Sequence, residues 1–306
     1  MRFGVVFPGQ GSQFVGMADP WTAHPAGKAV LEEASDVLGL DVVGACHDAA
    51  MLATTDFVQP ALLACDVAAF RVMQAEGLAR IAGVAGHSLG EFAALVAAGV
   101  SALAPMLSVM TVRGRAMQKA GEQRPGAMSA LLGVGASDAE AICDEARGDD
   151  VLLVANENSP QQVVISGSVA AIERAEELCA ARKVRSIRLK VAGAFHSPLM
   201  EPAVAPLGEA IDAVPFAAPR MPIASNVTGA LVADPDELRA LAKRHVISPV
   251  RWESCARSLA AAGAETFVEA GPGDVLTKLA KRAVPGSRAV AVGSPEAASL
   301  LLSGGA

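Results

Sequence analysis

The chain has 306 residues, which suits one large domain or a domain that carries an inserted smaller one. Hydrophobic residues make up 52% of the sequence, enough for a large core, but no stretch of about 20 apolar residues is free of charge. We therefore expect no membrane-spanning helix. The net charge of −7, without any basic run, argues against nucleic-acid binding. The first seven residues lack a basic start and a cleavage site, so we expect no secretion signal there.

Five cysteines are scattered without a Cys-x-x-Cys pair, a pattern typical of free thiols in a reducing compartment. We accordingly expect a cytoplasmic protein. The five histidines lack metal-ligand spacing, so no metal site is predicted. His24 and His47 lie in polar stretches typical of a surface. His245 follows Lys243 and Arg244 near the end of a predicted helix, where it can interact with the helix dipole.

The first 125 residues alternate between predicted strands and helices. Strands are predicted at 2–7 and 79–85, and helices at 60–74, 91–98 and 101–120. Each strand runs into a glycine-containing loop. This alternation is typical of an α/β fold with a parallel sheet.

The pattern changes near residue 126. The predicted elements are a strand, a helix, two strands, a helix and a strand, at residues 127–134, 137–146, 151–156, 161–166, 169–181 and 186–191. The order β-α-β-β-α-β is that of a ferredoxin-like unit. We therefore predict an inserted subdomain at 126–192 within a large domain formed by residues 1–125 and 193–306.

The remaining residues again combine helices and strands. The predicted elements are a helix, a hairpin, two helices, a buried strand and a last helix, at residues 199–214, 222–232, after 234–236, 252–262, 266–270 and after 271–273. The tail beyond residue 294 is rich in small residues, and we expect it to be frayed.

A Gly86-x-Ser88-x-Gly90 pattern lies between a predicted buried strand and a predicted helix. This is the context of a nucleophile elbow, in which a serine is exposed on a sharp turn and the glycines allow close backbone approach. The alternative is a structural turn whose serine caps the helix. The flanking strand and helix favour the elbow.

A nucleophilic serine needs a base and an oxyanion hole. His87 is a poor candidate because adjacent side chains diverge on a tight turn, so we favour His196, although a structural role stays open. The amide of Leu89 and a glycine-rich loop around Gln10 could bind an oxyanion, and a simple turn is the alternative for that loop.

Several stretches, taken together and in order, resemble the malonyl-CoA:acyl-carrier-protein transacylase family, the acyltransferases of fatty-acid and polyketide synthesis. They are FPGQGSQ at 7–13, QPA at 59–61, GHSLGE at 86–91, RGRAMQ at 113–118, NSPQQVVISG at 158–167, GAFHSPLM at 193–200, PVRW at 249–252 and EAGPG at 269–273. The ordered set covers nearly the whole chain. It implies a hydrolase-like large α/β domain with a ferredoxin-like insert.

The resemblance also implies roles for individual residues. Ser88 would be acylated, with His196 as general base and then acid, and the amides of Gln10 and Leu89 would form the oxyanion hole. Arg113 would hold the malonyl carboxylate, a role that the residues alone do not favour, since Arg115 is equally plausible by composition. Phe195 resembles the malonyl-selecting form of its motif.

In the family a backbone carbonyl orients the histidine, and Ser248 lies at the position that aligns. The implied substrate is malonyl-CoA, the implied partner is an acidic holo acyl carrier protein, and no cofactor is needed. The inserted unit has a basic cluster that either meets this partner or is an ordinary solvated face: Arg182, Lys183, Arg185, Arg188 and Lys190. Nothing in the sequence requires an oligomer, so we expect a monomer.

The sequence is also compatible with three other functions. One is a thioester hydrolase on the same scaffold, which would gain little from Arg113. A second is a transacylase of a dedicated polyketide or malonate-decarboxylase system, including one that uses another extender unit, because one methyl group changes pocket affinity by only about 1–3 kcal/mol. A third is a non-catalytic module that docks a carrier protein.

Overall fold

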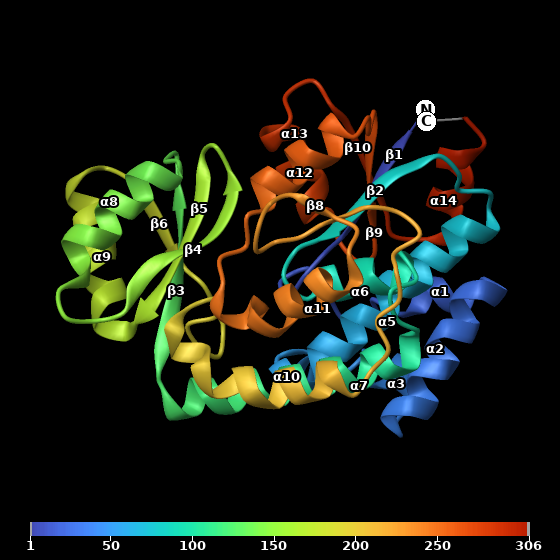
Figure 1. Ribbon diagram of the computed structural model, residues 1–306, viewed down its shortest axis with the longest axis horizontal. Coiled ribbons are helices and arrows are strands. Elements are labelled where there is room, and N and C mark those ends of the chain that lie inside the picture. The colour runs from blue at the N-terminus through green and yellow to red at the C-terminus, as the bar shows by residue number, and fades with distance from the viewer. Residues whose placement is uncertain (1, 305–306) are drawn as a thin grey trace.

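Two β-sheets organise the chain and lie side by side in Figure 1. The computed structural model describes residues 2–304. The larger sheet has six strands in the order β10-β9-β1-β2-β7-β8, and the smaller sheet has four in the order β4-β5-β3-β6. The α/β fold class expected from the sequence is confirmed.

The larger sheet is parallel except at one edge. Its parallel strands are β1 (Phe3–Phe7), β2 (Ile81–Gly86), β7 (Ile223–Ala224), β9 (Thr266–Ala270) and β10 (Arg288–Val292). The edge strand β8 (Leu231–Val232) pairs antiparallel with β7, which is the predicted hairpin. The central strands are buried on both faces, which explains their nearly continuous apolar runs.

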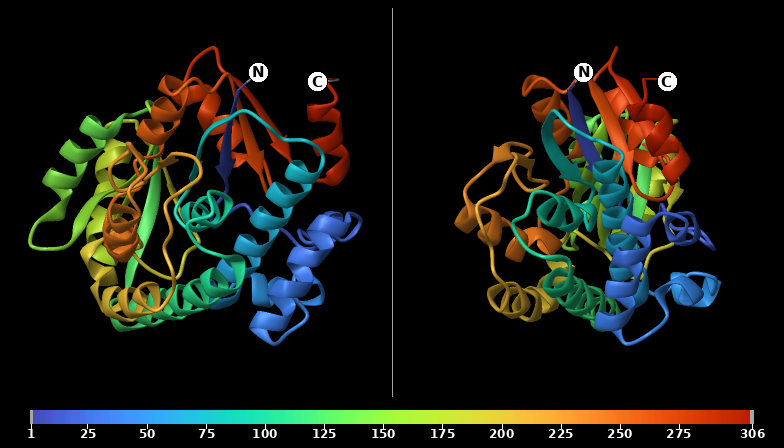
Figure 2. Two further views of the ribbon diagram at one scale, coloured as in Figure 1. Left: turned by 45° about the vertical axis from the view of Figure 1, so that its right-hand side comes forward. Right: turned by 90° about the vertical axis from the view of Figure 1, so that its right-hand side faces the viewer.

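Helices cover both faces of this sheet (Figure 2). One face packs against α12 (Trp252–Ala261) and α13 (Val275–Ala283). The other packs against α5 (Thr55–Ala75) and α6 (Gly90–Ala97), behind which lie α2 (Pro25–Leu38) and α7 (Leu103–Gln123). The remaining helical segments are α1 (Asp19–Thr22), α3 (Val42–Ala45), α4 (Ala49–Leu52), η1 (Pro198–Ala203), α10 (Val204–Asp212), α11 (Pro235–Arg244), η2 (His245–Ile247) and α14 (Pro295–Leu302).

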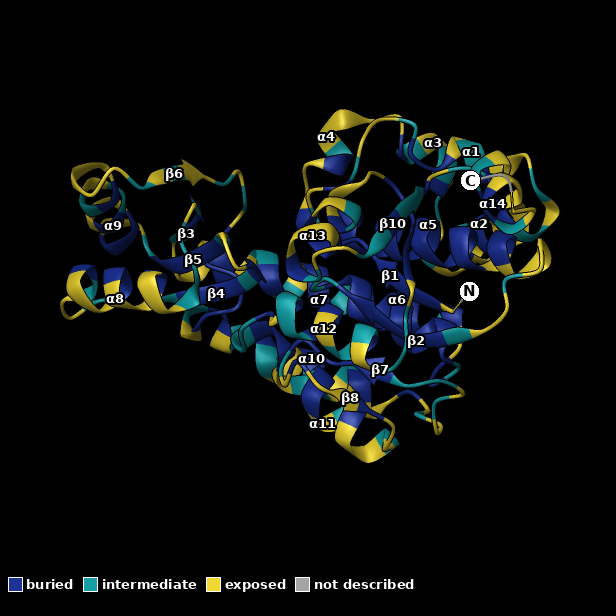
Figure 3. Cartoon of the chain, turned by 90° about the horizontal axis from the view of Figure 1, so that it is seen from above, coloured by how far each residue is buried: buried dark blue, intermediate teal, exposed yellow. Residues whose placement is uncertain are grey.

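The smaller sheet is antiparallel throughout. It consists of β3 (Gly126–Leu132), β4 (Leu152–Ser159), β5 (Gln162–Ser168) and β6 (Arg185–Arg188). Helices α8 (Ala136–Arg147) and α9 (Val169–Ala181) bury their apolar sides on it and expose their outer sides (Figure 3). The predicted ferredoxin-like order is therefore present.

The backbone joins the two sheets close to the site described below. Asn156 in β4 forms a parallel bridge with Val250, whose carbonyl accepts a hydrogen bond of 2.8 Å from the amide of Glu157. The small sheet thus holds the segment that precedes α12 in place.

Some predicted elements differ from the structure. The tail is not frayed from residue 294, because Ser294 caps α14 by accepting a hydrogen bond from the Ala297 amide. The strand predicted at 186–191 ends at Arg188, since residues 189–191 leave the sheet to line a cavity. The helices between residues 19 and 52 and strand β10 were not predicted. The four- and five-residue elements among them carry little periodic signal, but α2 has 14 residues, buries Val30, Leu31 and Ala34 at helical spacing, and was missed.

Within residues 2–304, no helix combines the length and the apolarity that crossing a bilayer requires. All five cysteines are buried and unpaired.

Candidate active site

The site lies where the central strands end. β1, β2 and β7 are neighbours and parallel, so the loops after them meet at one edge of the sheet. These loops carry Gln10, Ser88 and Asn226. The carboxyl edge is where open α/β sheets bind ligands.

Ser88 sits on a strained turn between β2 and α6. Its φ of 52° lies in the left-handed region, which is costly for a residue with a side chain. A Cβ on Gly86 would lie 1.8 Å from the carbonyl carbon of Gly90, and a Cβ on Gly90 would lie 2.2 Å from the carbonyl oxygen of Phe7. Only glycine allows these close approaches, so the two glycines are required for the elbow geometry.

His196 faces the serine. Its Nε2 lies 2.8 Å from Ser88 Oγ, and its Nδ1 lies 3.1 Å from the carbonyl oxygens of both His245 and Ser248. Because carbonyls only accept, Nδ1 carries the proton and Nε2 is free to accept the Ser88 hydroxyl proton. Burial, and then the charges of His245 and Arg113, lower the pKa of His196 well below its ordinary value. The ring is therefore neutral at neutral pH, as a general base must be.

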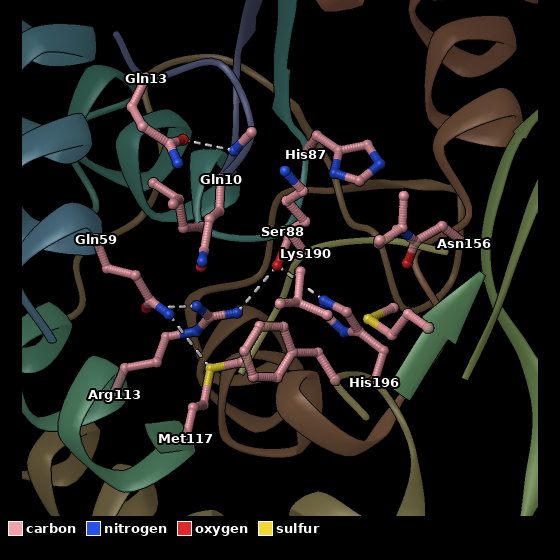
Figure 4. A pocket seen from close by; sticks show the side chains of 16 residues that line it. Gln10, Gln13, Gln59, His87, Ser88, Arg113, Met117, Asn156, Lys190 and His196 are labelled. Carbon is pink, nitrogen blue, oxygen red and sulfur yellow. Dashed lines mark hydrogen bonds between the residues drawn. The ribbon is translucent and has the colours of Figure 1, made fainter. Parts of the chain in front are cut away.

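Arg113 on α7 is a buried cation whose hydrogen-bond partners are all neutral. Its Nη1 donates to Gln59 Oε1 at 2.6 Å, and its Nη2 donates to Ser88 Oγ at 3.1 Å (Figure 4). It is 1% exposed, and among residues 2–304 it forms no ion pair. Burial lowers its pKa to about 9, against the opposing effect of the Glu91 carboxylate. Arg115, the other candidate on this helix, is exposed.

Two backbone amides point to an oxyanion site. The N–H groups of Gln10 and Leu89 have no acceptor among the hydrogen bonds of residues 2–304, and both residues line the cavity at Ser88. The adjacent Gly11 amide donates to Gln13 Oε1 at 2.6 Å, which fixes the loop after β1. The loop and the elbow are neighbours because β1 pairs with β2.

A cavity of about 250 Å³ opens over Ser88. Its lining combines Asn156 of β4 with Gln10 of the loop after β1 and Gln59 of α5, and Figure 4 shows Asn156 and Gln59 on opposite sides of Ser88. Phe195 also lines it and is almost fully buried. The sequence candidates Ser88, His196, Gln10, Leu89, Arg113 and Phe195 are therefore together in one cavity, with the Ser248 carbonyl behind the histidine.

Three further residues lie in the site although the sequence analysis gave them no role there. Gln59 pairs with Arg113, and the QPA motif was its only signal. Asn226 accepts a hydrogen bond of 2.8 Å from the Ser88 amide. His245 follows the end of α11, as predicted, but its side chain is 1% exposed and lies beside Arg113 in the site. By contrast, His87 turns away from Ser88 and bonds Asn158 Oδ1 at 2.8 Å.

The chain is similar to known acyltransferases along nearly its whole length. The sequence profile described as acyl transferase domain matches residues 5–298. Malonyl CoA-acyl carrier protein transacylase of Escherichia coli (strain K12) is 40% identical over 305 residues, covering 98% of this chain and 99% of the relative. The Bacillus subtilis (strain 168) protein of the same name is 36% identical, and the match covers 98% of this chain and 96% of that relative.

Solved structures give the same result. Acyl-carrier-protein S-malonyltransferase from Burkholderia pseudomallei 1710b has a TM-score of 0.95 and 38% identity, over 99% of this chain and all of that one. A malonyl-transacylase in complex with its type II polyketide synthase acyl carrier protein has a TM-score of 0.95 and 36% identity. The match covers 99% of this chain and 100% of that one. The chain therefore belongs to the acyltransferase family that contains the malonyl-CoA:acyl carrier protein transacylases.

Proposed function

We propose that this chain transfers a malonyl group from coenzyme A to the pantetheine thiol of an acyl carrier protein, through an ester on Ser88. The full-length likeness to transacylases supports the reaction. The observation that carries the substrate class is the buried guanidinium of Arg113, which lacks an anionic partner beside the Ser88–His196 pair. A planar guanidinium binds a carboxylate through two parallel hydrogen bonds, so a malonyl group completes this site.

In the first half-reaction, Ser88 Oγ bonds to the thioester carbonyl carbon while its proton passes to His196 Nε2, 2.8 Å away. The amides of Gln10 and Leu89 stabilise the oxyanion that develops. The carbon–sulfur bond then breaks, and the coenzyme A sulfur takes the proton from His196. The serine is left as a malonyl ester with its carboxylate on Arg113.

In the second half-reaction, the carrier's thiol gives its proton to His196, and its sulfur bonds to the ester carbonyl carbon. The bond to Ser88 Oγ breaks, and the serine takes the proton back. The Ser248 and His245 carbonyls keep Nδ1 protonated throughout, which holds the ring in one orientation. Arg113 holds the acyl group so that water is poorly placed, which favours transfer over hydrolysis.

Phe195 is the proposed selectivity residue. Its ring lines the cavity directly before His196, where it limits the space for a substituent on the α-carbon of the acyl group. One methyl group is worth about 1–3 kcal/mol in such a pocket, so we expect a preference for malonyl over methylmalonyl but not complete exclusion.

The proposed carrier surface is the basic cluster within the proposed insert, residues 126–192. Two of its members are already paired, Arg182 with Glu145 and Arg188 with Glu176, and these pairs reduce its net charge. Lys183 and Arg185 are exposed, and Lys190 lines the cavity. These three are the charges most available to an acidic partner.

We also propose a monomer, and a cytoplasmic location that the five unpaired thiols support.

Intact-protein mass spectrometry after brief mixing with malonyl-CoA tests the reaction. Wild type should gain one malonyl group and lose it on addition of holo carrier protein, whereas Ser88→Ala should gain none. Ser101→Ala is the control, because the Ser101 hydroxyl is buried and has no partner among residues 2–304, and this variant should acylate normally.

Two outcomes would contradict the proposal. An adduct that water removes as fast as carrier protein does would indicate a thioester hydrolase. No adduct with malonyl-CoA, acetyl-CoA or methylmalonyl-CoA would mean that the chain is not an acyltransferase of this kind.

A further inference from the structure

The side chain of His245 is a buried group that the mechanism above does not use. Only its backbone carbonyl has a role there, in orienting His196. Its ring packs edge to face on Phe92, with centroids 5.7 Å apart, and on His196, with centroids 5.4 Å apart. Both ring nitrogens meet polar atoms, so this histidine is more than an apolar filler.

The hydrogen-bond partners determine which nitrogen carries the proton. His245 Nδ1 lies 3.4 Å from Arg113 Nη2, and a guanidinium can only donate, so Nδ1 accepts. The proton is then on Nε2, which lies 3.3 Å from Asn226 Oδ1 and 3.5 Å from Glu91 Oε2. Both of these atoms are acceptors. The His245 ring therefore accepts a hydrogen bond from Arg113 at Nδ1 and donates one to Asn226 at Nε2.

Asn226 continues the path to the nucleophile. Its Oδ1 accepts the Ser88 amide at 2.8 Å, and its Nδ2 donates to the Gly86 carbonyl at 2.7 Å. Its own amide donates to Glu91 Oε2 at 2.7 Å. The Asn226 side chain thus bonds the backbone both before and after His87, at Gly86 and at Ser88. These bonds help to hold Ser88 in its costly left-handed conformation.

Arg113 is fixed from two sides by this arrangement. Gln59 accepts from Nη1, while Ser88 and His245 accept from Nη2, so three of its five N–H bonds are used. Its Nε is buried and has no hydrogen-bond partner among the residues that the structure describes. The orientation of the guanidinium beside Ser88 therefore depends on the neutral acceptors around it.

We propose that His245 is a positioning residue for acyl selection: it aims the guanidinium of Arg113 and, through Asn226, holds it in a fixed position relative to Ser88. The inference rests on the proposed roles of Ser88 and Arg113. Loss of its two nitrogens should impair donors with a free carboxylate and spare uncharged donors. A merely structural role would impair both kinds alike.

The test measures kcat and KM for acylation by malonyl-CoA and by acetyl-CoA. His245→Phe removes both nitrogens and keeps a ring against Phe92 and His196. The variant should lower kcat/KM for malonyl-CoA about tenfold, mainly by raising KM, because the buried Nη2 of Arg113 loses an acceptor. It should change kcat/KM for acetyl-CoA by less than about threefold. His245→Gln, which offers one acceptor and one donor, should restore malonyl-CoA to within about threefold of wild type.

A double-mutant cycle with Arg113→Ala shows whether His245 acts through the guanidinium. In that background His245→Phe should have no further effect on the malonyl preference. Thermal unfolding identifies a variant that does not fold, and His245→Leu then makes the same deletion with a smaller side chain.

The outcomes separate this inference from the proposed function. Equal losses with both donors, or the same loss without Arg113, would overturn the role of His245 alone. An Arg113→Ala variant that keeps the wild-type malonyl preference would overturn the carboxylate clamp and this inference together.

Discussion

The nucleophile and its base are built in different ways, although both residues have a left-handed backbone, with φ of 52° for Ser88 and 58° for His196. Ser88 lies between a strand and a helix, and its turn is set by glycines two residues before and after it. His196 lies in an irregular segment between β6 and η1, and carbonyls about 50 residues further along the chain orient its ring. Neighbouring glycines thus allow the turn of the nucleophile, which Asn226 also supports, whereas the ring of the base is oriented by tertiary contacts alone.

The largest expected effect comes from removing the nucleophile or the base, because malonyl transfer needs both. Ser88→Ala and His196→Ala should each lower kcat for malonyl transfer by at least about 10⁴-fold, and the double variant should be no worse than the weaker single one. The reason is that neither group is useful without the other. Steady-state transfer to holo carrier protein measures this, and multiplicative losses in the double variant would show that the two act separately.

The second prediction compares a glycine beside the nucleophile, Gly86, with a glycine in the segment that carries the base, Gly193. Gly86→Ala places a Cβ 1.8 Å from backbone, where no side chain can yield, so it should cost about 4 kcal/mol of unfolding free energy or abolish folding. Gly193→Ala, on the base side, brings its Cβ only to 3.0 Å from Gly121 Cα and should cost about 1 kcal/mol.

Gly208→Ala is the control for both glycine variants. Gly208 lies in helix α10 with open space around its Cα, so the added methyl should be neutral or stabilising by up to about 1 kcal/mol. Denaturant unfolding measures all three variants, and equal costs for Gly86→Ala and Gly193→Ala would contradict the contrast between the two sides.

The smallest expected effect concerns pH. The lowered pKa of His196 means that its neutral form persists to lower pH than in free histidine. Activity should therefore be lost as pH falls through a value below 6.5. Arg113→Met removes a cation that opposes protonation, so the acid limb of kcat/KM should move to higher pH.

Arg115→Met is the matched control, since Arg115 is exposed on the same helix and should leave the acid limb unchanged. An acid limb that does not move in Arg113→Met would mean that Arg113 does not contribute to the lowered pKa of His196.

The same contrast explains what the sequence could and could not predict. The α/β alternation, the ferredoxin-like order and the Ser88 elbow are carried by neighbouring residues, and sequence patterns predict them. The choice of Arg113 over Arg115 depends on which side of α7 faces Gln59, and the residues alone left it open. The position of His245 at the end of α11 was predicted, but its burial beside Arg113 was not, because that burial depends on tertiary contacts with Phe92 and His196.

The unmatched charge of Arg113 also bears on which form of the enzyme accumulates. A buried cation without a counter-ion raises the free energy of the unacylated protein, and the carboxylate of a malonyl ester would lower that of the intermediate. Exchanging a thioester for a serine ester then becomes more favourable with malonyl than with an uncharged acyl group. We therefore expect the malonylated enzyme to be the resting state whenever donor is plentiful and carrier is scarce, so that the protein holds its acyl group until a thiol arrives.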